Sequence, residues 1–411
     1  MKKAQFFITL FGLLALLALV FGGCDNPADG DDDGDLIAVT GITGVCVSGA
    51  ADIPITFTGT VQPVNATNKT ITWSVQSAGT TGSTFTSTNT LTAIATGTLV
   101  VRAAIANGTA AGTPYIQDFT IDIISLPAYA MISVPAGTVS TSIDYNDSTE
   151  GYGEGPFADA GTTPVTVPAF NIGETEITYA LWKAVLDWAI HTDREIRQYT
   201  FPANTGKEGD DGTAGAVATN QEPVTNIRGR DMIVWCNSYS EATGKTPVYY
   251  LAGTTDFNDT TQIIRESEAS NVNYKNAKAE NAVINPSANG FRLPTETQWE
   301  YAGRGGDPAD STNWSYLYAG SDTLNDVAVH SVSHTAEVKS KDPNSLGLYD
   351  MSGNLNEFCE DIGSSDNYSQ YRQRRGGHYG VDCTVNGLLT WRDTYNTNQA
   401  SQALGFRVVT P

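Results

Sequence analysis

The last stretch of the chain, from Arg374 to Arg407, constrains the fold most, because its two ends look fixed and its middle does not. A Gly376-Gly377 pair lies near its start, and Gly405-Phe406-Arg407 closes it. The residues between them follow neither the 3.6-residue period of a helix nor the two-residue period of a strand. Such a segment is either a solvated loop or a displayed binding surface, and we expect the second.

Length and charge limit what the rest of the chain can be. Its 411 residues suffice for two or three domains with buried cores. A net charge of -22 makes nucleic acid an unsuitable partner. The 40 glycines indicate turn-rich, β-containing structure rather than helical bundles.

The amino terminus has the features of a secretory signal. Lys2 and Lys3 precede the apolar run FFITLFGLLALLALVFGG, which ends at Cys24. Gly22-Gly23-Cys24 resembles a bacterial lipobox, which implies removal of residues 1–23 and a diacylglycerol group on the Cys24 sulfur. The alternative is an uncleaved helix. In either case we expect an exported protein held at a membrane, and the lipobox favours a lipid anchor at the outer membrane or cell surface.

Residues 24–35 contain DNPADGDDDGD and no large apolar group, so we expect a flexible acidic linker. Their aspartates imitate the start of an EF-hand loop. The glutamate that would close such a loop falls at Thr40, and a calcium loop is therefore rejected.

Residues 36–125 have the pattern of an all-β unit. Short β-branched runs alternate with Asn, Gly and Thr turns, which predicts an antiparallel sandwich. The stretch VQPVNATNKTITWSV, followed by TGTLVVRAAI, resembles the group 2 bacterial immunoglobulin-like domains. The resemblance implies that Trp73 fills the core and that the domain is a spacer.

Residues 126–411 contain several long motifs. Gly290–Gly306 reads GFRLPTETQWEYAGRGG, where Thr295 is expected to cap a helix and Arg292 to pair with Glu300. Gly347–Asp361 reads GLYDMSGNLNEFCED. With MISVPAGT, FNIGETEITYALWKAVL and PVTNIRGRDMIVWCNSYS, these stretches resemble the formylglycine-generating, sulfatase-modifying family. The expected fold class is therefore multidomain: an all-β Ig-like sandwich, then an α+β C-type-lectin-like domain rich in irregular structure.

The resemblance does not bring the family's catalytic residues with it. Active members use two cysteines after the Gly-Gly motif and bind copper, whereas this segment has only Cys383, and Val381 stands near the first family position. His330 and His334 have i, i+4 spacing but lie in a stretch that alternates like a strand, which favours two unrelated surface histidines. We therefore expect no enzyme activity and no required cofactor.

The family's calcium site is matched more closely. It maps to Asp350, Gly353, Leu355 and Glu357, with backbone oxygens from the middle two, so that the resemblance implies a structural Ca²⁺. The alternative is a turn motif kept for folding, since carboxylates in turns are common without metal.

The terminal segment is most similar to that of the variable proteins of diversity-generating retroelements, in which codons between Arg-Gly-Gly and Gly-Phe-Arg are rewritten at adenines. The run HYGVDCTVNGLLT contains no Trp, Met, Lys, Gln or Glu, as such rewriting implies. An ordinary inactive member with drifted loops is the alternative. The variable-type ligand-binding positions are then His378, Tyr379, Gly380, Val381, Asp382, Val385, Asn386, Leu388, Leu389, Trp391, Asp393, Tyr395, Asn396 and Asn398.

Three functions compete at this point. The first and favoured one is a lipid-anchored surface protein that binds a ligand, a protein or a glycan, through these loops. The second is an oxidase of the formylglycine-generating type, and the third is a purely structural envelope lipoprotein. The sequence names neither the ligand nor the oligomeric state.

Overall fold

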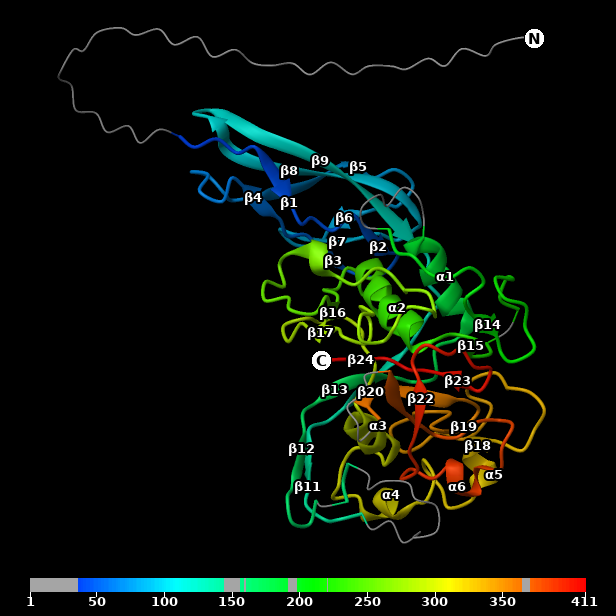
Figure 1. Cartoon of the computed structure of the whole chain (residues 1–411). Coiled ribbons are helices and arrows are strands. Elements are labelled where there is room, and N and C mark those ends of the chain that lie inside the picture. Colours follow the sequence, from blue (N-terminus) through cyan, green and yellow to red (C-terminus); the bar gives the residue numbers. More distant parts are fainter. Residues whose placement is uncertain (1–35, 144–155, 159, 191–197, 220, 364–369) are drawn as a thin grey trace, which may run out of the picture. The chain divides into compact units, whose positions relative to one another are not determined.

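The structure is a computed structural model that describes residues 36–143, 156–158, 160–190, 198–219, 221–363 and 370–411 (Figure 1). The signal peptide, Cys24 and the acidic linker lie outside the described residues. In the part of the chain that is described, no helix is both long and apolar enough to cross a membrane.

The amino-terminal part of the described chain is all-β, as its alternating sequence predicts. Its buried side chains recur at every second position along the longest strands, which is the period of a strand with one face on a core. The strands are β1 (Gly41–Thr43), β2 (Ser48–Ala50), β3 (Ile55–Thr56), β4 (Thr60–Gln62), β5 (Thr72–Ser77), β6 (Thr84–Phe85), β7 (Thr90–Thr92), β8 (Gly97–Ala110) and β9 (Thr113–Ile124).

Two of the sheets in this part share one core. The first has the order β2-β9-β8-β5 and the second the order β3-β7-β6. The pairs are antiparallel except for β2 with β9, which is parallel. Trp73 is only 8% exposed in this core and packs on Phe57, with ring centroids 5.4 Å apart. The prediction for Trp73 is confirmed, whereas membership of the Ig-like class stays a prediction.

The remainder of the chain combines short strands, short helices and long irregular connections. The helices are α1 (Tyr179–Ala189), α2 (Gly229–Ala242), the 3-10 turn η2 (Thr260–Gln262), α3 (Glu296–Gly303), α4 (Ser311–Ser315), α5 (Leu324–Val327) and α6 (Cys383–Asn386). The strands are β10 (Met131–Val134), β11 (Gly137–Val139), β12 (Val165–Val167), β13 (Phe170–Gly173), β14 (Lys207–Glu208), β15 (Val224–Thr225), β16 (Tyr249–Tyr250), β17 (Val283–Ile284), β18 (Ala328–Val329), β19 (Ser352–Gly353), β20 (Asn356–Ile362), β21 (Tyr371–Arg375), β22 (Asp393–Asn396), β23 (Leu404–Gly405) and β24 (Val409–Thr410).

Helices α1 and α2 build the largest apolar core. Thr178 caps α1 by accepting a hydrogen bond from the Leu181 N–H, and apolar residues then recur on one face of the helix. Trp182 of α1 stacks on Trp235 of α2, with ring centroids 5.6 Å apart and an interplanar angle of 7°. Both indoles are fully buried, so this pair fixes the two helices against each other.

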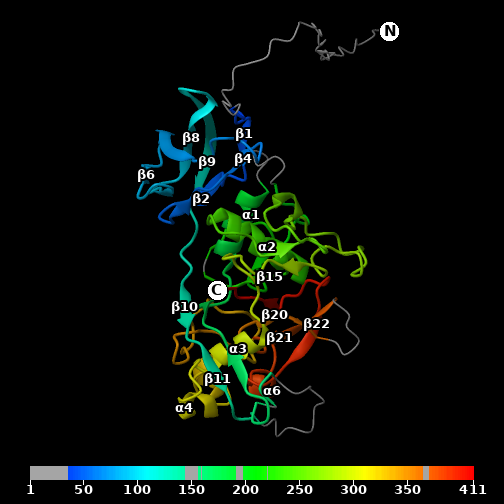
Figure 2. The same ribbon diagram turned by 90° about the vertical axis from the view of Figure 1, so that its left-hand side faces the viewer.

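The sheet that carries the terminal segment has the order β22-β21-β20-β23, and Figure 2 shows β20, β21 and β22 beside one another. Strand β21 leads into the segment and β22 lies within it, paired antiparallel from Tyr371 with Asn396 to Arg374 with Asp393. Strand β22 ends the sheet on one side. Parts of the terminal segment, in β21, β22 and β23, are therefore regular sheet, which its sequence period did not predict.

Helix α3 begins as the sequence predicts. Thr295 is its N-cap, and its side chain accepts from the Gln298 N–H. The expected ion pair between Arg292 and Glu300 is wrong. Arg292 donates to Gln298 Oε1 at 2.9 Å, whereas Glu300 pairs with Arg304 and Arg375.

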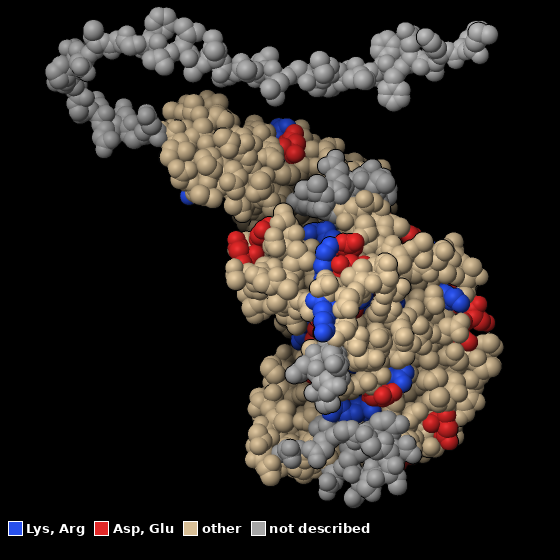
Figure 3. All heavy atoms as spheres, viewed as in Figure 1, with Lys and Arg blue, Asp and Glu red and all other residues tan. Residues whose placement is uncertain are grey.

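Much of the face shown in Figure 3 is uncharged. A narrow strip of Lys and Arg side chains runs down the middle of this view, and the other charged groups are scattered. This agrees with a chain in which only 17% of residues are charged.

Candidate ligand-binding site

The terminal segment is fixed at its start by a fully buried arginine. Arg375 donates to Glu296 at 3.0 Å, to Glu300 at 2.5 Å and to the Leu389 carbonyl at 2.6 Å. Gly376 and Gly377 follow with φ angles of 93° and 74°, which other residues adopt at a cost. The chain thus leaves the sheet through a turn whose direction is strongly constrained.

The end of the segment is fixed in the same way. Phe406 is fully buried, with its ring edge-on to Trp182 and to Trp235 at centroid distances of 6.0 and 5.5 Å. Arg407, also fully buried, donates to both carboxylate oxygens of Glu357 at 2.7 and 2.6 Å. Both residues therefore belong to the buried interior of the domain.

Residues His378–Leu388 form a largely accessible part of the terminal segment, and we name them the display segment. The short helix α6 lies within it, and its N-cap Asp382 accepts from the Thr384 N–H at 3.0 Å. Gly380, Asp382 and Thr384 are exposed; His378, Tyr379, Val381, Val385, Asn386 and Leu388 are half-buried. The side chains predicted for binding are here accessible and held by local hydrogen bonds.

Leu389 and Trp391 do not belong to this surface, and their prediction as binding positions is corrected. Leu389 is fully buried in the core that contains Trp299 and Met351, and Trp391 is 4% exposed. The buried Arg375 holds the Leu389 carbonyl and so turns the chain inward at this residue. Neighbouring leucines, Leu388 and Leu389, therefore have opposite environments.

The strand β22 residues are held by the sheet. Asp393 forms an ion pair with Arg374, and Tyr395 packs edge-on to Phe358 with ring centroids 6.3 Å apart. The Arg374 guanidinium also lies over the Tyr395 ring, 5.2 Å from its centroid. Asp393, Tyr395 and Asn396 are half-buried, so they are partly accessible but already engaged.

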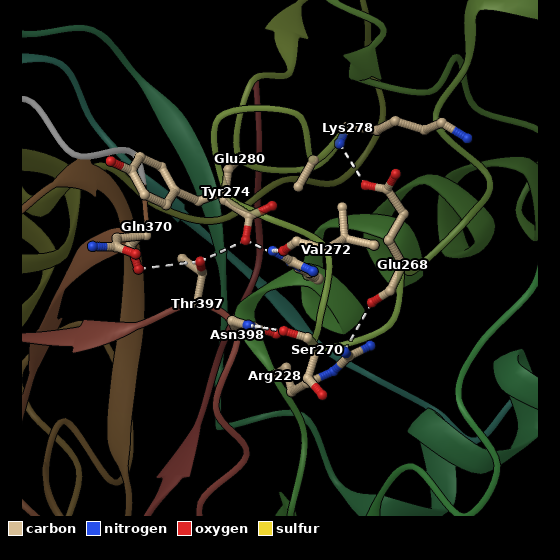
Figure 4. Close-up of polar contacts among 12 residues, drawn as sticks. Arg228, Glu268, Ser270, Val272, Tyr274, Lys278, Glu280, Gln370, Thr397 and Asn398 are labelled. Carbon is tan, nitrogen blue, oxygen red and sulfur yellow. Dashed lines mark hydrogen bonds and ion pairs between the residues drawn. The ribbon is translucent and has the colours of Figure 1, made fainter.

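The chain at Thr397 and Asn398, the last predicted position, is hydrogen-bonded to a loop from far upstream, as Figure 4 shows. Thr397 is buried and donates to Glu280 at 2.8 Å, and Glu280 also accepts from Arg230 at 2.5 Å. The Asn398 amide donates to the Ser270 carbonyl. Asn398 therefore has a structural contact, which makes it a weaker candidate for ligand binding than the display segment.

Cys383 offers little to redox chemistry. It is fully buried, burial raises the pKa of its thiol to about 11, and its sulfur lies 3.4 Å from the His378 carbonyl. A thiol with a raised pKa is a poor nucleophile. Cys236 and Cys359 are also buried free thiols and lie in other elements. Between described residues, the structure contains no disulfide.

The four residues expected to hold calcium lie in one short stretch that runs from Asp350 through β19 into β20, and the carboxylate of Glu357 already accepts other hydrogen bonds. Both of its oxygens accept from Arg407, and one also accepts from the Trp299 indole at 2.7 Å. Asp350 is buried and accepts from the Lys339 N–H at 3.0 Å. As these side chains lie, they do not fit an ion at this turn, and calcium would have to compete with Arg407. Within the described chain, no three His, Cys, Asp or Glu side chains form a metal-binding group.

We expect Asp350→Asn to distinguish a calcium site from a turn motif that is kept only for folding. Burial raises the pKa of Asp350 to about 6. Its folded pKa thus exceeds its unfolded pKa, so its contribution to stability is full below about pH 4 and is lost as the pH rises through 6. In chelator, wild type should lose on the order of 1 kcal/mol more than the variant between pH 5 and 7.

The measurement is the melting temperature against pH, with and without millimolar calcium. A bound ion should stabilise wild type but not Asp350→Asn. Asparagine suits the left-handed backbone at this position, where φ is 57°, so the substitution introduces no strain of its own. If calcium leaves the wild-type melting temperature unchanged, the calcium prediction is wrong.

His330 and His334 have separate partners. His330 lies 2.9 Å from the Asn325 amide oxygen, and His334 lies 3.3 Å from Asp210. Strand β18 ends before His330, so the pair is not on one strand as expected. Two unrelated surface histidines remain the better description.

Sequence reasoning missed two residues beside the display segment. Leu317 and Val332 are 53% and 47% exposed, and both bond to the terminal segment through their backbones. The sequence around Leu317 and Val332 has no hydrophobic period that would identify them, because both lie in an irregular connection. Only the three-dimensional neighbourhood identifies them.

Comparison with known proteins gives a consistent family. The model of the sulfatase-modifying factor enzyme 1-like domain matches residues 86–411. Chaperone protein LppX of Paenibacillus barcinonensis is 27% identical over 263 residues, covering 60% of this chain and 81% of that protein. Formylglycine-generating enzyme of Streptomyces coelicolor is 28% identical over 290 residues, covering 63% of this chain and 84% of that protein.

Two solved structures are similar to this chain over about two thirds of its length. The structure of CarF has a TM-score of 0.54 and 28% identity, covering 69% of this chain and 98% of CarF. Treponema denticola variable protein 1 has 27% identity and a TM-score of 0.47, covering 69% of this chain and 95% of that protein. The family match begins at residue 86, upstream of the boundary expected at residue 126.

Proposed function

The chain belongs to the sulfatase-modifying factor enzyme 1-like family, and we propose that it uses this fold to bind a macromolecular ligand at the cell surface rather than to catalyse a reaction. One observation carries the proposal. The display segment lies within a terminal segment whose two ends are held by fully buried arginines, Arg375 and Arg407, while most of its own side chains remain accessible. Such a surface can change its side chains with little effect on the fold.

The enzyme alternative rests on the family, which includes proteins named formylglycine-generating enzyme. Its chemistry, as the family resemblance describes it, needs a pair of cysteines in the terminal segment. This chain has only Cys383 there, with its thiol buried. We expect no conversion of a cysteine-containing peptide to a formylglycine product when copper and oxygen are supplied. Product formation by wild type, lost in Cys383→Ser, would favour the oxidase.

The binding proposal is tested by selection. A random peptide library displayed on phage is selected on the immobilised full chain. Selected peptides should lose binding to a variant with Tyr379→Ala, Val381→Ala and Asp382→Ala, whose melting temperature should stay close to that of wild type because these residues are half-buried or exposed. Peptides that bind wild type and this triple variant equally would argue against the display segment as the binding site.

We further propose that the chain is exported and anchored through lipid on Cys24, with the all-β unit as a spacer. The apolar run ending in Gly22-Gly23-Cys24 motivates this proposal. Cys24→Ala should release the protein from the membrane fraction or misplace it. Mass spectrometry of the wild-type protein should find no residue before Cys24, and an intact apolar run would rule the lipoprotein out.

We also propose that the display segment is diversified. The test is the surrounding DNA, which should contain a near-repeat of the last codons that differs only at adenines, next to a reverse transcriptase. Changes should then fall on accessible positions such as Tyr379 and Val381 and spare the buried Leu389. Substitutions spread evenly over both groups would indicate ordinary drift.

A further inference from the structure

A second loop lies beside the display segment. Residues 316–335, which we name the flanking loop, form backbone hydrogen bonds with Tyr379, near the start of the display segment, and with Leu389, the residue that follows it. The Val332 N–H donates to the Tyr379 carbonyl at 2.9 Å, and the Leu389 N–H donates to the Leu317 carbonyl at 2.9 Å. In Figure 1, the elements of the flanking loop, α5 and β18, lie next to α6 of the display segment. The two chain segments therefore present their surfaces together.

The flanking loop adds apolar surface to this region. Leu317 is 53% exposed and Val332 is 47% exposed. Val381 and Leu388 of the display segment are half-buried and pack on a small core formed by Tyr318, Leu324, Val327, Ala328 and Cys383. A single exposed aliphatic side chain is ordinary, but several around one accessible segment are typical of an interaction surface.

Carboxylates lie around this apolar surface. Asp322 accepts from the Leu317 N–H at 2.9 Å, and Asp382 begins α6. Both lie near the hydroxyl of Tyr318, whose pKa is raised by burial first and then by Asp382, Cys383 and Asp322. Among the described residues, neither Asp322 nor Asp382 has a Lys or Arg partner within ion-pair distance.

More acidic groups lie at the opposite end, beside Tyr379. Burial and then Asp210 raise the pKa of the Tyr379 hydroxyl. Asp211 follows in the chain with its side chain 68% exposed, 4.0 Å from His334. The apolar surface is thus bordered by carboxylates on two sides.

Resting on the proposed function, we propose that Leu317 and Val332 form one binding face with the display segment, and that this face takes a protein segment carrying Lys or Arg next to an apolar side chain. Aliphatic groups provide the area that is removed from water, and the bordering carboxylates select a cationic partner. The flanking loop lies outside the segment proposed to vary. It supplies a constant part of the recognition, to which the display segment adds the changeable part.

The test uses the peptides selected on the full chain. Peptides dependent on the display segment should be enriched in Lys or Arg beside aliphatic or aromatic residues. Their affinity should fall about tenfold or more in Leu317→Ser with Val332→Ser, as for central interface contacts. Asp322→Asn with Asp382→Asn should weaken binding at low salt and reduce its salt dependence. The matched control is Val64→Ser with Asp256→Asn, an exposed valine and an exposed aspartate outside both segments, which should leave binding unchanged.

The outcomes separate this inference from the proposed function. If peptides depend on Tyr379, Val381 and Asp382 but bind the Leu317 and Val332 variant as wild type, the segment binds and the flanking loop does not, so the inference fails alone. If the selected peptides are neutral or acidic, or if only glycans on an array bind, the cationic partner is wrong. Melting temperatures of all variants should match wild type, because the substituted side chains are mostly accessible.

Discussion

Arg407→Ala is expected to lower the free energy of unfolding by about 3–5 kcal/mol, the usual effect of breaking a buried ion pair by removing one partner. Arg407 and Glu357 are both fully buried, and the guanidinium contacts both carboxylate oxygens. It also donates to the carbonyls of Gly173 and Tyr349, at 3.0 and 2.8 Å. Without it, the buried Glu357 carboxylate loses its cationic partner and keeps only the Trp299 indole as a side-chain donor, and two carbonyls lose the hydrogen bonds that Arg407 donates.

Urea denaturation measured by fluorescence gives the comparison. The matched control is Lys183→Ala, which breaks an i, i+4 pair with Asp187 whose side chains are 25% and 55% exposed. That change should cost roughly 0.5 kcal/mol or less. Arg407→Lys keeps the charge but loses the planar fork and should fall between the two. A loss near that of Lys183→Ala would show that Arg407 is not the anchor described.

The second large effect concerns two adjacent leucines. Leu389→Ala should destabilise the protein by about 2–5 kcal/mol, because it removes a fully buried side chain and leaves a cavity. Leu388→Ala should cost roughly 1 kcal/mol or less, because Leu388 is half-buried on the display segment. The same chemical change at neighbouring positions thus tests the boundary between surface and core.

Binding should show the opposite order. Leu388→Ala should lower the affinity for the selected peptides. Leu389→Ala, measured at a temperature where it remains folded, should bind them with nearly the affinity of wild type. Melting temperature and peptide affinity are the two readouts. Equal losses of stability at both leucines would mean that the whole segment is core, and the display proposal would then have to be abandoned.

Features decided by neighbours in the sequence were predicted well. Thr295 caps α3 because a hydroxyl three residues before an amide is a local arrangement. Trp73 lies in a core because alternation places one face of a strand inward. Phe406 belongs to the Gly405-Phe406-Arg407 end that looked fixed in the sequence, and it is fully buried.

Partners distant in the sequence could not be chosen from it. Glu300 has basic residues on several sides, and it pairs with Arg304 and Arg375 instead of the expected Arg292. Glu357 was read as a calcium ligand, but the fold brings Arg407 to it from 50 residues away. Many candidate partners satisfy a charge equally well in the sequence, and only the packed chain decides which of them is within reach.

In the terminal segment, too, some features follow from the local sequence and others only from the tertiary structure. The sequence determined its glycine and Gly-Phe-Arg limits, its lack of a helical period and its single cysteine. Only the tertiary structure decided that Leu388 is accessible and Leu389 buried, and that Thr397 meets Glu280. In irregular backbone no period links one residue's direction to the next, so burial is set by long-range contacts that the local sequence does not encode.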